Sequence, residues 1–201
     1  MNMIFHREPA GWPGLVAFGL GGLIFIASVL LARRRGDAAG KGATRGRANI
    51  TWAGIVVQGI GITCAAVGPI HIVSGTPTGV MLLRAVIVFA LMVGAVGLFN
   101  AASRTMGKNW SFVARTRTDH VLVQSGPFAH VRHPIYVAMF LFLCAMAIAY
   151  GHINALIIAI PVFALGTWLR ISQEERLLRE MFGSEYDAYA ARVKRFVPGI
   201  F

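Results

Sequence analysis

Two clusters of polar side chains carry the residue types in this sequence that could do chemistry. The first cluster is the stretch RHPIY (132–136), and the second runs from Arg170 to the paired carboxylates Glu174 and Glu175. Cations, an imidazole and carboxylates in one place suit a ligand that carries both charge signs. Apolar and aromatic side chains near the first cluster would suit an aromatic base. These are Val121, Leu122, Val123, Phe128 and Tyr136. Together the clusters predict a pocket for a zwitterionic cofactor with an aromatic base.

Other common kinds of site leave no pattern in the sequence. It contains no CxxC or HExxH pattern for a metal, no GxSxG nucleophile turn and no Walker loop for phosphates. The two cysteines, Cys64 and Cys144, stand alone in apolar runs, where a thiol usually belongs to the packed core. We therefore expect neither a metal site nor a disulfide framework.

The composition is that of an integral membrane protein. Of the 201 residues, 56% are hydrophobic and 13% are charged, whereas a soluble domain carries about 25% charged residues. The formal net charge of +11 could attract nucleic acid, but the basic residues stand in short loops beside long apolar runs. That placement is typical of a membrane topology signal. It makes membrane lipids, and not nucleic acid, the expected partners.

Apolar runs divide the chain into candidate membrane spans, each close to the length of about 20 residues that a bilayer core requires. The fold class predicted is all-α, with about five transmembrane helices and a cytosolic C-terminal helical pocket for the cofactor. Arg84 lies inside the third run, where it could snorkel to the surface or serve a function. The expected spans are residues 13–32, 50–72, 79–102, 134–150 and 153–169.

The basic residues alternate between the two sides of these spans. Residues 33–49 contain six basic residues, residues 103–133 contain five, and the tail 170–201 contains six. The three segments on the other side contain only Arg7. Since basic loops stay in the cytoplasm, the pattern predicts a multi-pass membrane protein with its N-terminus outside and its C-terminus and site cytoplasmic.

The spacing of the last two runs would bring the two polar clusters to one level. From His133 to Gly151 is 18 residues, and from Gly151 to Arg170 is 19. At about 1.5 Å of rise per residue, an antiparallel helical hairpin would return the second cluster to the level of the first. Pro134 suits the first turn of a helix, so His133 would lie at the positive end of that helix, opposite the carboxylates.

At these residues the sequence resembles the isoprenylcysteine carboxyl methyltransferase family, within a wider group that includes phospholipid N-methyltransferases. The resemblance covers about the last 96 residues, whereas the first three spans are similar to the family only in being apolar spans. The combination of RHPxY with a paired-Glu block and FGxEYxxY is specific. The matching pieces are MGKNWS (106–111), HVLVQSGPF (120–128), RHPIY (132–136) and EERLLREMFGSEYDAYAARVKRFVP (174–198).

The resemblance implies a membrane methyltransferase that uses S-adenosylmethionine (SAM) at the cytosolic side. Arg170 would orient a substrate carboxylate, and Glu174 would hold the amino acid end of the cofactor. Phe128 stands where the family often has tyrosine, so a hydroxyl contact there is lost. The residues that the resemblance assigns to the cofactor are His120, Val121, Leu122, Val123, Phe128, His133, Pro134, Ile135, Tyr136 and Glu174.

The methyl acceptor stays open at this stage. A carboxylate acceptor, as in isoprenylcysteine, is already ionised at neutral pH and needs no base. An amine acceptor, as in a phospholipid, would need a base, for which Glu175 is the candidate at the substrate side. A thiol acceptor would need a thiolate, which the neighbouring arginines could favour. In each case the partner is a lipophilic small molecule or a lipidated substrate.

The interpretation as a methyltransferase divides the chain into two parts. It also leaves open one alternative in which the protein is not an enzyme. Residues 1–102 would form three N-terminal transmembrane helices. Residues 103–201 would form the catalytic part, with a cytosolic loop, a helical hairpin (134–170) and an amphipathic tail that ends near Pro198. The alternative is a non-catalytic membrane module that binds anionic lipid through its basic loops. A transporter fits less well, since no inverted repeat is visible.

Overall fold

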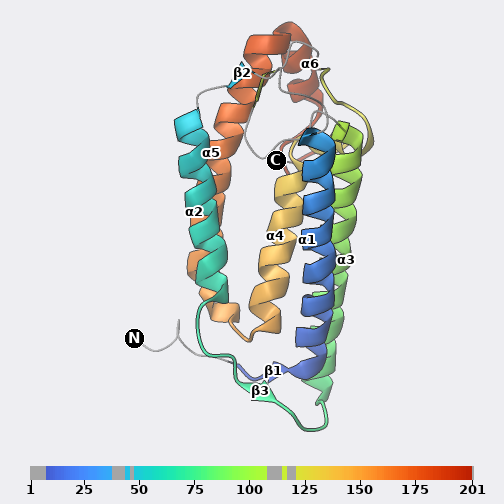
Figure 1. Cartoon of the computed structure of the whole chain (residues 1–201), viewed down its shortest axis with the longest axis vertical. Coiled ribbons are helices and arrows are strands. Elements are labelled where there is room, and N and C mark those ends of the chain that lie inside the picture. Colours follow the sequence, from blue (N-terminus) through green and yellow to red (C-terminus); the bar gives the residue numbers. More distant parts are fainter. Residues whose placement is uncertain (1–7, 38–43, 46–47, 108–114, 117–120, 201) are drawn as a thin grey trace.

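The computed structural model describes residues 8–37, 44–45, 48–107, 115–116 and 121–200, and these residues are mostly helical (Figure 1). The coarse fold class predicted from the sequence is therefore confirmed. The α-helices are α1 (Trp12–Asp37), α2 (Ala48–Ala66), α3 (Gly79–Met106), α4 (Pro134–Ala149), α5 (Leu156–Phe182) and α6 (Ser184–Arg192). Two short 3-10 helices, η2 (Gly126–Ala129) and η3 (Ile153–Ala155), precede α4 and α5.

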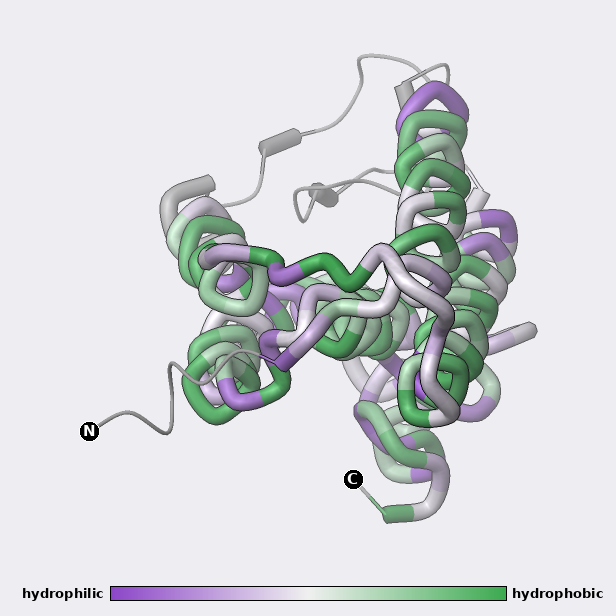
Figure 2. The backbone as a smooth tube through the Cα atoms, turned by 90° about the horizontal axis from the view of Figure 1, so that it is seen from below, coloured by the Kyte–Doolittle hydropathy of each residue, from purple (hydrophilic) through white to green (hydrophobic). Residues whose placement is uncertain are grey.

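Three of the described helices are long and apolar enough to cross a membrane. They cover Trp12–Gly36, Gly79–Met106 and Ile153–Phe182, and two shorter apolar helices cover Trp52–Ala66 and Pro134–Ala149. The end-on view in Figure 2 shows hydrophobic residues around the long helices and not on one face alone. A helix that is apolar all round is typical of surroundings without water.

Two pairs of very short strands add to the helices, which the prediction of an all-α fold did not include. β1 (Ala10–Gly11) pairs in parallel with β3 (Ile72–Val73), at the end of the molecule where α1 and α3 begin (Figure 1). β2 (Thr44–Arg45) pairs with β4 (Arg115–Thr116) in antiparallel register. These strands join loops that are far apart in the sequence.

Arg84 is accounted for by an ion pair near the β1–β3 end of the bundle. Its guanidinium contacts the carboxylate of Glu8, and both side chains are partly exposed. The side chain thus has an acidic partner from the segment that precedes α1. This contact lies far along α3 from the polar cluster that is described below.

The helical hairpin of α4 and α5 is antiparallel as expected, but its two helices pack mainly against other helices. α5 packs along α2, whereas α4 packs along α3 and α1 (Figure 1). Aromatic rings join α1 to both α4 and α3, because Phe18 and Phe25 of α1 pack on Phe142 of α4. Phe25 also packs on Phe99 of α3, and the ring centroids of the three pairs are 5.0–5.3 Å apart. α4 and α5 therefore make little contact with each other, and a space remains between them.

Glycines explain why α5 lies against α2. A Cβ added at Gly61 of α2 would lie 2.6 Å from the backbone nitrogen of Phe163 in α5. A Cβ added at Gly166 of α5 would collide with the backbone of Gln58 in α2. Only residues without a side chain allow two backbones to approach so closely, and such close approach is a main source of packing between helices in membranes.

We expect Gly61→Ala and Gly166→Ala each to lower the stability of the fold by about 1–3 kcal/mol, because the added methyl groups force the two backbones apart. Gly59→Ala is the matched control, since nothing lies within 4 Å of a Cβ added there. Thermal unfolding in detergent measures the effect. A loss of stability in Gly59→Ala as large as in the other two variants would contradict this explanation of the α2–α5 contact.

The C-terminal tail is not the single helix that the sequence predicted. α5 continues without a break through Arg170 to Phe182, and Gly183 then turns the chain with a φ of +49°. The backbone N–H of Gly183 bonds the carbonyl of Arg179, which closes the helix. α6 follows and ends at Arg192, and Val193 after it is extended. The turn at Gly183 folds the tail back toward the start of α4.

Candidate functional site

The polar segment that precedes α4 is held by contacts with the tail. Gly126 begins η2 with a φ of +58°, in the left-handed region that favours glycine, and Phe128 is buried. The Tyr189 hydroxyl of α6 donates a hydrogen bond of 2.7 Å to the Phe128 carbonyl. Burial raises the pKa of Tyr189 to about 12, so this phenol remains a neutral donor at neutral pH. α6 therefore fixes the loop that leads into α4.

The extended residues after α6 pair with the residues just before α4. The Arg132 N–H donates to the Lys194 carbonyl at 2.8 Å, and the His133 N–H donates to the Arg195 carbonyl at 3.1 Å. Val131 and Lys194 form a parallel bridge. Pro134 is buried at the first position of α4, where its missing N–H costs no hydrogen bond. The tail and the start of α4 thus form one unit.

Glu175 is the buried centre of the polar cluster, and only 1% of it is exposed. Arg195 binds it with two bonds, from Nε at 3.0 Å and from Nη2 at 2.8 Å. His133 Nε2 lies 3.1 Å and Arg132 Nη2 lies 3.2 Å from its Oε1. The hydrogen bonds to this carboxylate raise the pKa of Arg195. The predicted meeting of the two clusters is therefore confirmed, with Glu175 at their centre.

Glu174 takes a different position from Glu175. Its side chain is 27% exposed, accepts a hydrogen bond from the Tyr136 hydroxyl and lies 4.0 Å from His133 Nδ1. Consecutive residues of a helix point in different directions, so one carboxylate faces inward and the other lies near the surface. Among the paired carboxylates, Glu174 is the one that a ligand can reach.

Arg170 lies beside the ring of Tyr136. Its guanidinium carbon is 5.1 Å from the ring centroid, and its Nη1 donates to Gln58 Oε1 of α2 at 2.9 Å. Tyr136 therefore contacts both the carboxylate of Glu174, through its hydroxyl, and the guanidinium of Arg170, through its ring. Arg170 itself is not among the residues that line the pocket next to Tyr136.

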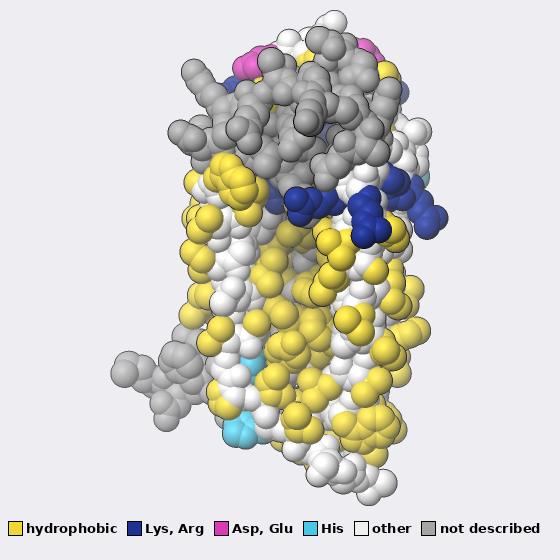
Figure 3. Space-filling view, viewed as in Figure 1, with side chains coloured by type: hydrophobic (Ala, Val, Ile, Leu, Met, Phe, Trp, Pro, Cys, Tyr) yellow, Lys and Arg dark blue, Asp and Glu magenta, His cyan; other side chains and the backbone are white. Residues whose placement is uncertain are grey.

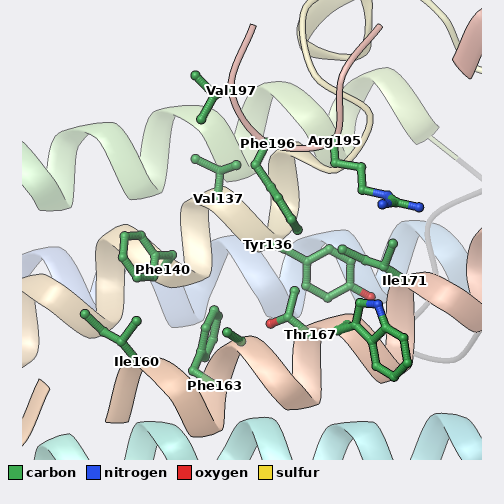
Figure 4. Close-up of a pocket in the computed structure, with 12 residues that line it drawn as sticks. Tyr136, Val137, Phe140, Ile160, Phe163, Thr167, Ile171, Arg195, Phe196 and Val197 are labelled. Atoms are coloured by element: carbon green, nitrogen blue, oxygen red, sulfur yellow. The ribbon is translucent and has the colours of Figure 1, made fainter. Parts of the chain in front are cut away.

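This pocket occupies the space between α4 and α5 and has a volume of about 450 Å³. Its wall is almost entirely apolar and includes the neighbouring rings of Phe140 from α4 and Phe163 from α5, whose centroids are 6.2 Å apart (Figure 4). The tail closes it with Phe196 and Val197, while Tyr136 and Arg195 contribute the polar atoms near the cluster. The remaining lining residues are Val137, Ile160, Ala164, Thr167, Trp168 and Ile171.

The other residues that the sequence assigned to the cofactor are only partly located. His120 lies outside the described residues. Val121 is exposed, while Leu122 and Val123 are partly buried in an irregular segment, and none of the three lines the pocket. Ile135 packs against the hydrophobic core of the bundle. The structure thus brings His133 and Tyr136 together with the paired carboxylates, whereas residues 121–123 do not line the pocket.

Several residues of this region received no role in the sequence analysis, among them Gln58, Arg195, Phe196 and Val197. Gln58 is a buried amide within an apolar helix, and such a residue in a membrane span is itself a signal of a specific contact. Arg195, Phe196 and Val197 belong to the tail block that carries the resemblance, but no role was assigned to them. Their place in the pocket depends on the turn at Gly183, which the pattern of the tail did not indicate.

Comparisons with known proteins point to one family. Residues 83–180 match the isoprenylcysteine carboxyl methyltransferase (ICMT) family. A protein-S-isoprenylcysteine O-methyltransferase of Schizosaccharomyces pombe is 30% identical over 107 residues, which are 50% of this chain and 44% of that protein. One of Tribolium castaneum is 35% identical over 109 residues, which are 51% of this chain and 37% of that protein.

A relative with a different name matches over a similar length. A nickel-cobalt-cadmium resistance protein of Alcaligenes xylosoxydans xylosoxydans is 32% identical over 104 residues, which are 51% of this chain and 48% of that protein. In the described part of the chain, no three His, Cys, Asp or Glu side chains gather as a ligand set for a metal ion. The chain matches less than half the length of each of these curated relatives.

Proposed function

We propose that the protein is a membrane methyltransferase that methylates a lipophilic carboxylate, from the premise that residues 83–180 match the isoprenylcysteine carboxyl methyltransferase family. The observation that carries the proposal is the junction of a charged cluster with an apolar pocket of about 450 Å³. The cluster suits a zwitterionic cofactor and a charged acceptor group, and the pocket suits a hydrocarbon chain. Tyr136 belongs to both and would separate the two ligands.

The cofactor that fits this arrangement is S-adenosylmethionine, which supplies an electrophilic methyl group when it is bound. The partly exposed carboxylate of Glu174, fixed by the Tyr136 hydroxyl, suits the ammonium of its amino acid end. His133 beside Glu174 adds a donor or acceptor for the same end. The residues that we propose to hold the cofactor are His120, Val121, Leu122, Val123, Phe128, His133, Pro134, Ile135, Tyr136 and Glu174.

The hydrocarbon part of the acceptor would occupy the pocket between α4 and α5, and its carboxylate would meet Arg170 beside Tyr136. A carboxylate needs no proton removed at neutral pH. The protein therefore has to orient the acceptor and exclude water, for which an apolar pocket and a fixed guanidinium are suited. We assign the binding of the acceptor carboxylate to Arg170.

The contacts of Glu175 favour a carboxylate acceptor over an amine acceptor. A base for an amine must reach the acceptor nitrogen, but Glu175 is 1% exposed and is bound by Arg195 and His133. Glu175 would then act on substrate binding only indirectly, because it holds Arg195 and the tail against the pocket. These contacts do not decide between a carboxylate and a thiol acceptor, and the assay described below compares the two.

We also propose that all five apolar helices cross the membrane, with the N-terminus outside and the C-terminus and the site in the cytoplasm. The division at residue 102 into three N-terminal helices and a catalytic part belongs to this proposal. Two observations support it. The shorter α2 and α4 run alongside the long helices between the same two ends (Figure 1). Lys and Arg side chains gather at one end of the molecule, above a surface of hydrophobic side chains (Figure 3).

An assay with the purified protein in detergent tests the proposal, by measuring the transfer of labelled methyl groups from SAM to several acceptors. The acceptors are an S-farnesylcysteine derivative with a free carboxylate, phosphatidylethanolamine and an alkyl thiol. We expect label in the farnesylcysteine product and its release by alkali, since only the ester is labile. A labelled product that is stable to alkali would show that the acceptor group is an amine or a thiol. No product with any acceptor from a folded protein would contradict the function.

A further inference from the structure

Gln58 of α2 is a buried polar residue that contacts the second cluster. Only 2% of it is exposed, although it stands in the middle of an apolar helix. Its Nε2 donates to Thr167 Oγ1 at 2.8 Å, and its Oε1 accepts from Arg170 Nη1 at 2.9 Å. Both partners belong to α5, three residues apart. One side chain from α2 thus joins two residues of α5, one of which lines the pocket.

The chemistry of the partners fixes the orientation of the amide. A guanidinium can only donate hydrogen bonds, so the oxygen of Gln58 must face Arg170 and its nitrogen must face the hydroxyl of Thr167. With the amide turned over, two donors would face each other in an apolar surrounding. The guanidinium of Arg170 therefore determines which atom of Gln58 it meets, and the Thr167 hydroxyl, which can accept as well as donate, receives the Gln58 nitrogen.

The backbone of α2 is also shaped around Arg170. A Cβ added at Gly54, one turn before Gln58, would lie 2.5 Å from Cγ of Arg170. Gly54 leaves room for the aliphatic part of Arg170, and Gln58 holds its head. The ring of Tyr136, 5.1 Å from the guanidinium carbon, lies on a further side of the group. Arg170 is thus located by contacts from α2 and α4 as well as by its own helix.

We propose that Gln58 is a positioning residue for acceptor binding, which sets the orientation of the Arg170 guanidinium beside Tyr136. This inference rests on the proposed function, in which Arg170 receives the acceptor carboxylate. Bidentate binding of a carboxylate requires the guanidinium plane in a defined orientation, and a hydrogen bond to Nη1 restricts rotation about the end of a long side chain. Gln58 lies outside the segment that matches the family, which begins at residue 83.

Two substitutions test the role of Gln58. Gln58→Met keeps a similar volume but removes both hydrogen bonds, so the guanidinium loses its fixed orientation. Gln58→Glu places a carboxylate opposite Arg170, which would compete with the acceptor carboxylate for the same cation. We expect each to raise the KM for the farnesylcysteine acceptor about tenfold or more. The dissociation constant of S-adenosylhomocysteine should stay within about twofold of the wild type.

Thr63→Val is the matched control on the same helix. The Thr63 hydroxyl is exposed and, among the residues that the structure describes, bonds the Gly59 carbonyl of its own helix, so its removal should leave both constants unchanged. An unchanged KM for the acceptor in a folded Gln58→Met protein would overturn the inference. A parallel loss of S-adenosylhomocysteine binding would also overturn it, because the role would then be structural. A wild type that transfers no methyl group is a separate result, and it contradicts the proposed function itself.

Discussion

Replacing Arg170 with Ala should reduce methyl transfer to a carboxylate acceptor about 100-fold or more, because the acceptor loses its charged partner and its alignment. Binding of S-adenosylhomocysteine should stay within about twofold of the wild type. This separation follows from the geometry. Arg170 contacts the face of the Tyr136 ring and Gln58 of α2, whereas Glu174, which we assign to the cofactor, is hydrogen-bonded to the Tyr136 hydroxyl.

Two further variants make this result specific to the guanidinium. Arg170→Lys keeps the positive charge but cannot bind a carboxylate through two parallel hydrogen bonds, so we expect a loss between those of the wild type and Arg170→Ala. Arg176→Ala is the matched control on the same helix, because this side chain is 44% exposed and contacts Glu180 at 3.8 Å. Equal losses of transfer and of S-adenosylhomocysteine binding in Arg170→Ala would remove Arg170 from the substrate side.

Replacing Glu175 with Gln should destabilise the protein by about 3–5 kcal/mol, since the largely buried Arg132 and the partly exposed Arg195 then lose the buried carboxylate that they share. Arg195 and Arg132 both contact Glu175, and His133 adds a third contact. The tail after α6 is joined to the start of α4 through these side chains. We therefore expect a lower unfolding temperature and faster cleavage by trypsin after Lys194 and Arg195.

Glu180→Gln is the control for this substitution. Glu180 stands five residues later on α5, and its side chain is 64% exposed in its contact with Arg176. An exposed pair of this kind contributes about 0–1 kcal/mol, so the variant should unfold near the wild-type temperature with unchanged trypsin sensitivity. Similar unfolding temperatures for Glu175→Gln and Glu180→Gln would show that Glu175 does not hold the tail.

The level at which the two clusters meet could be predicted because it depends on length alone. The segments on either side of Gly151 have nearly equal numbers of residues, and helical rise then returns Glu175 to His133. The start of α4 at Pro134 followed equally from local chemistry. Both inferences use neighbouring residues or a simple count, and neither requires knowledge of which helices pack together.

The packing partners of the helices could not be predicted in the same way. The long helices α1 and α3 are apolar around most of their surface, so no hydrophobic face indicates their neighbours, and α5 is apolar only up to the charged cluster that begins at Arg170. The α2–α5 contact depends on where Gly61 and Gly166 meet across two helices, a relation between distant positions. The hydrogen bond between Gln58 and Arg170 forms only because α2 packs on α5. Since that packing was not predicted, the sequence analysis assigned no role to Gln58.

The tail shows the limit of reading a charged pattern as one helix. Charged and apolar residues alternate at helical spacing on both sides of Gly183, and only the positive φ at that residue divides the pattern. After the turn, backbone hydrogen bonds from Arg132 and His133 to the tail place Arg195 and Phe196 at the pocket. Pairing between extended segments that are some sixty residues apart leaves no local signal in the sequence.

The most direct test is calorimetric titration of S-adenosylhomocysteine into the purified protein in detergent, beside the variant Glu174→Gln. We expect saturable binding at one molecule per chain in the wild type. In a variant that unfolds at a similar temperature, binding should be at least about tenfold weaker, because the carboxylate that meets the ammonium is lost. A folded wild type that releases no heat of binding at any accessible concentration would contradict a methyltransferase site in this cluster.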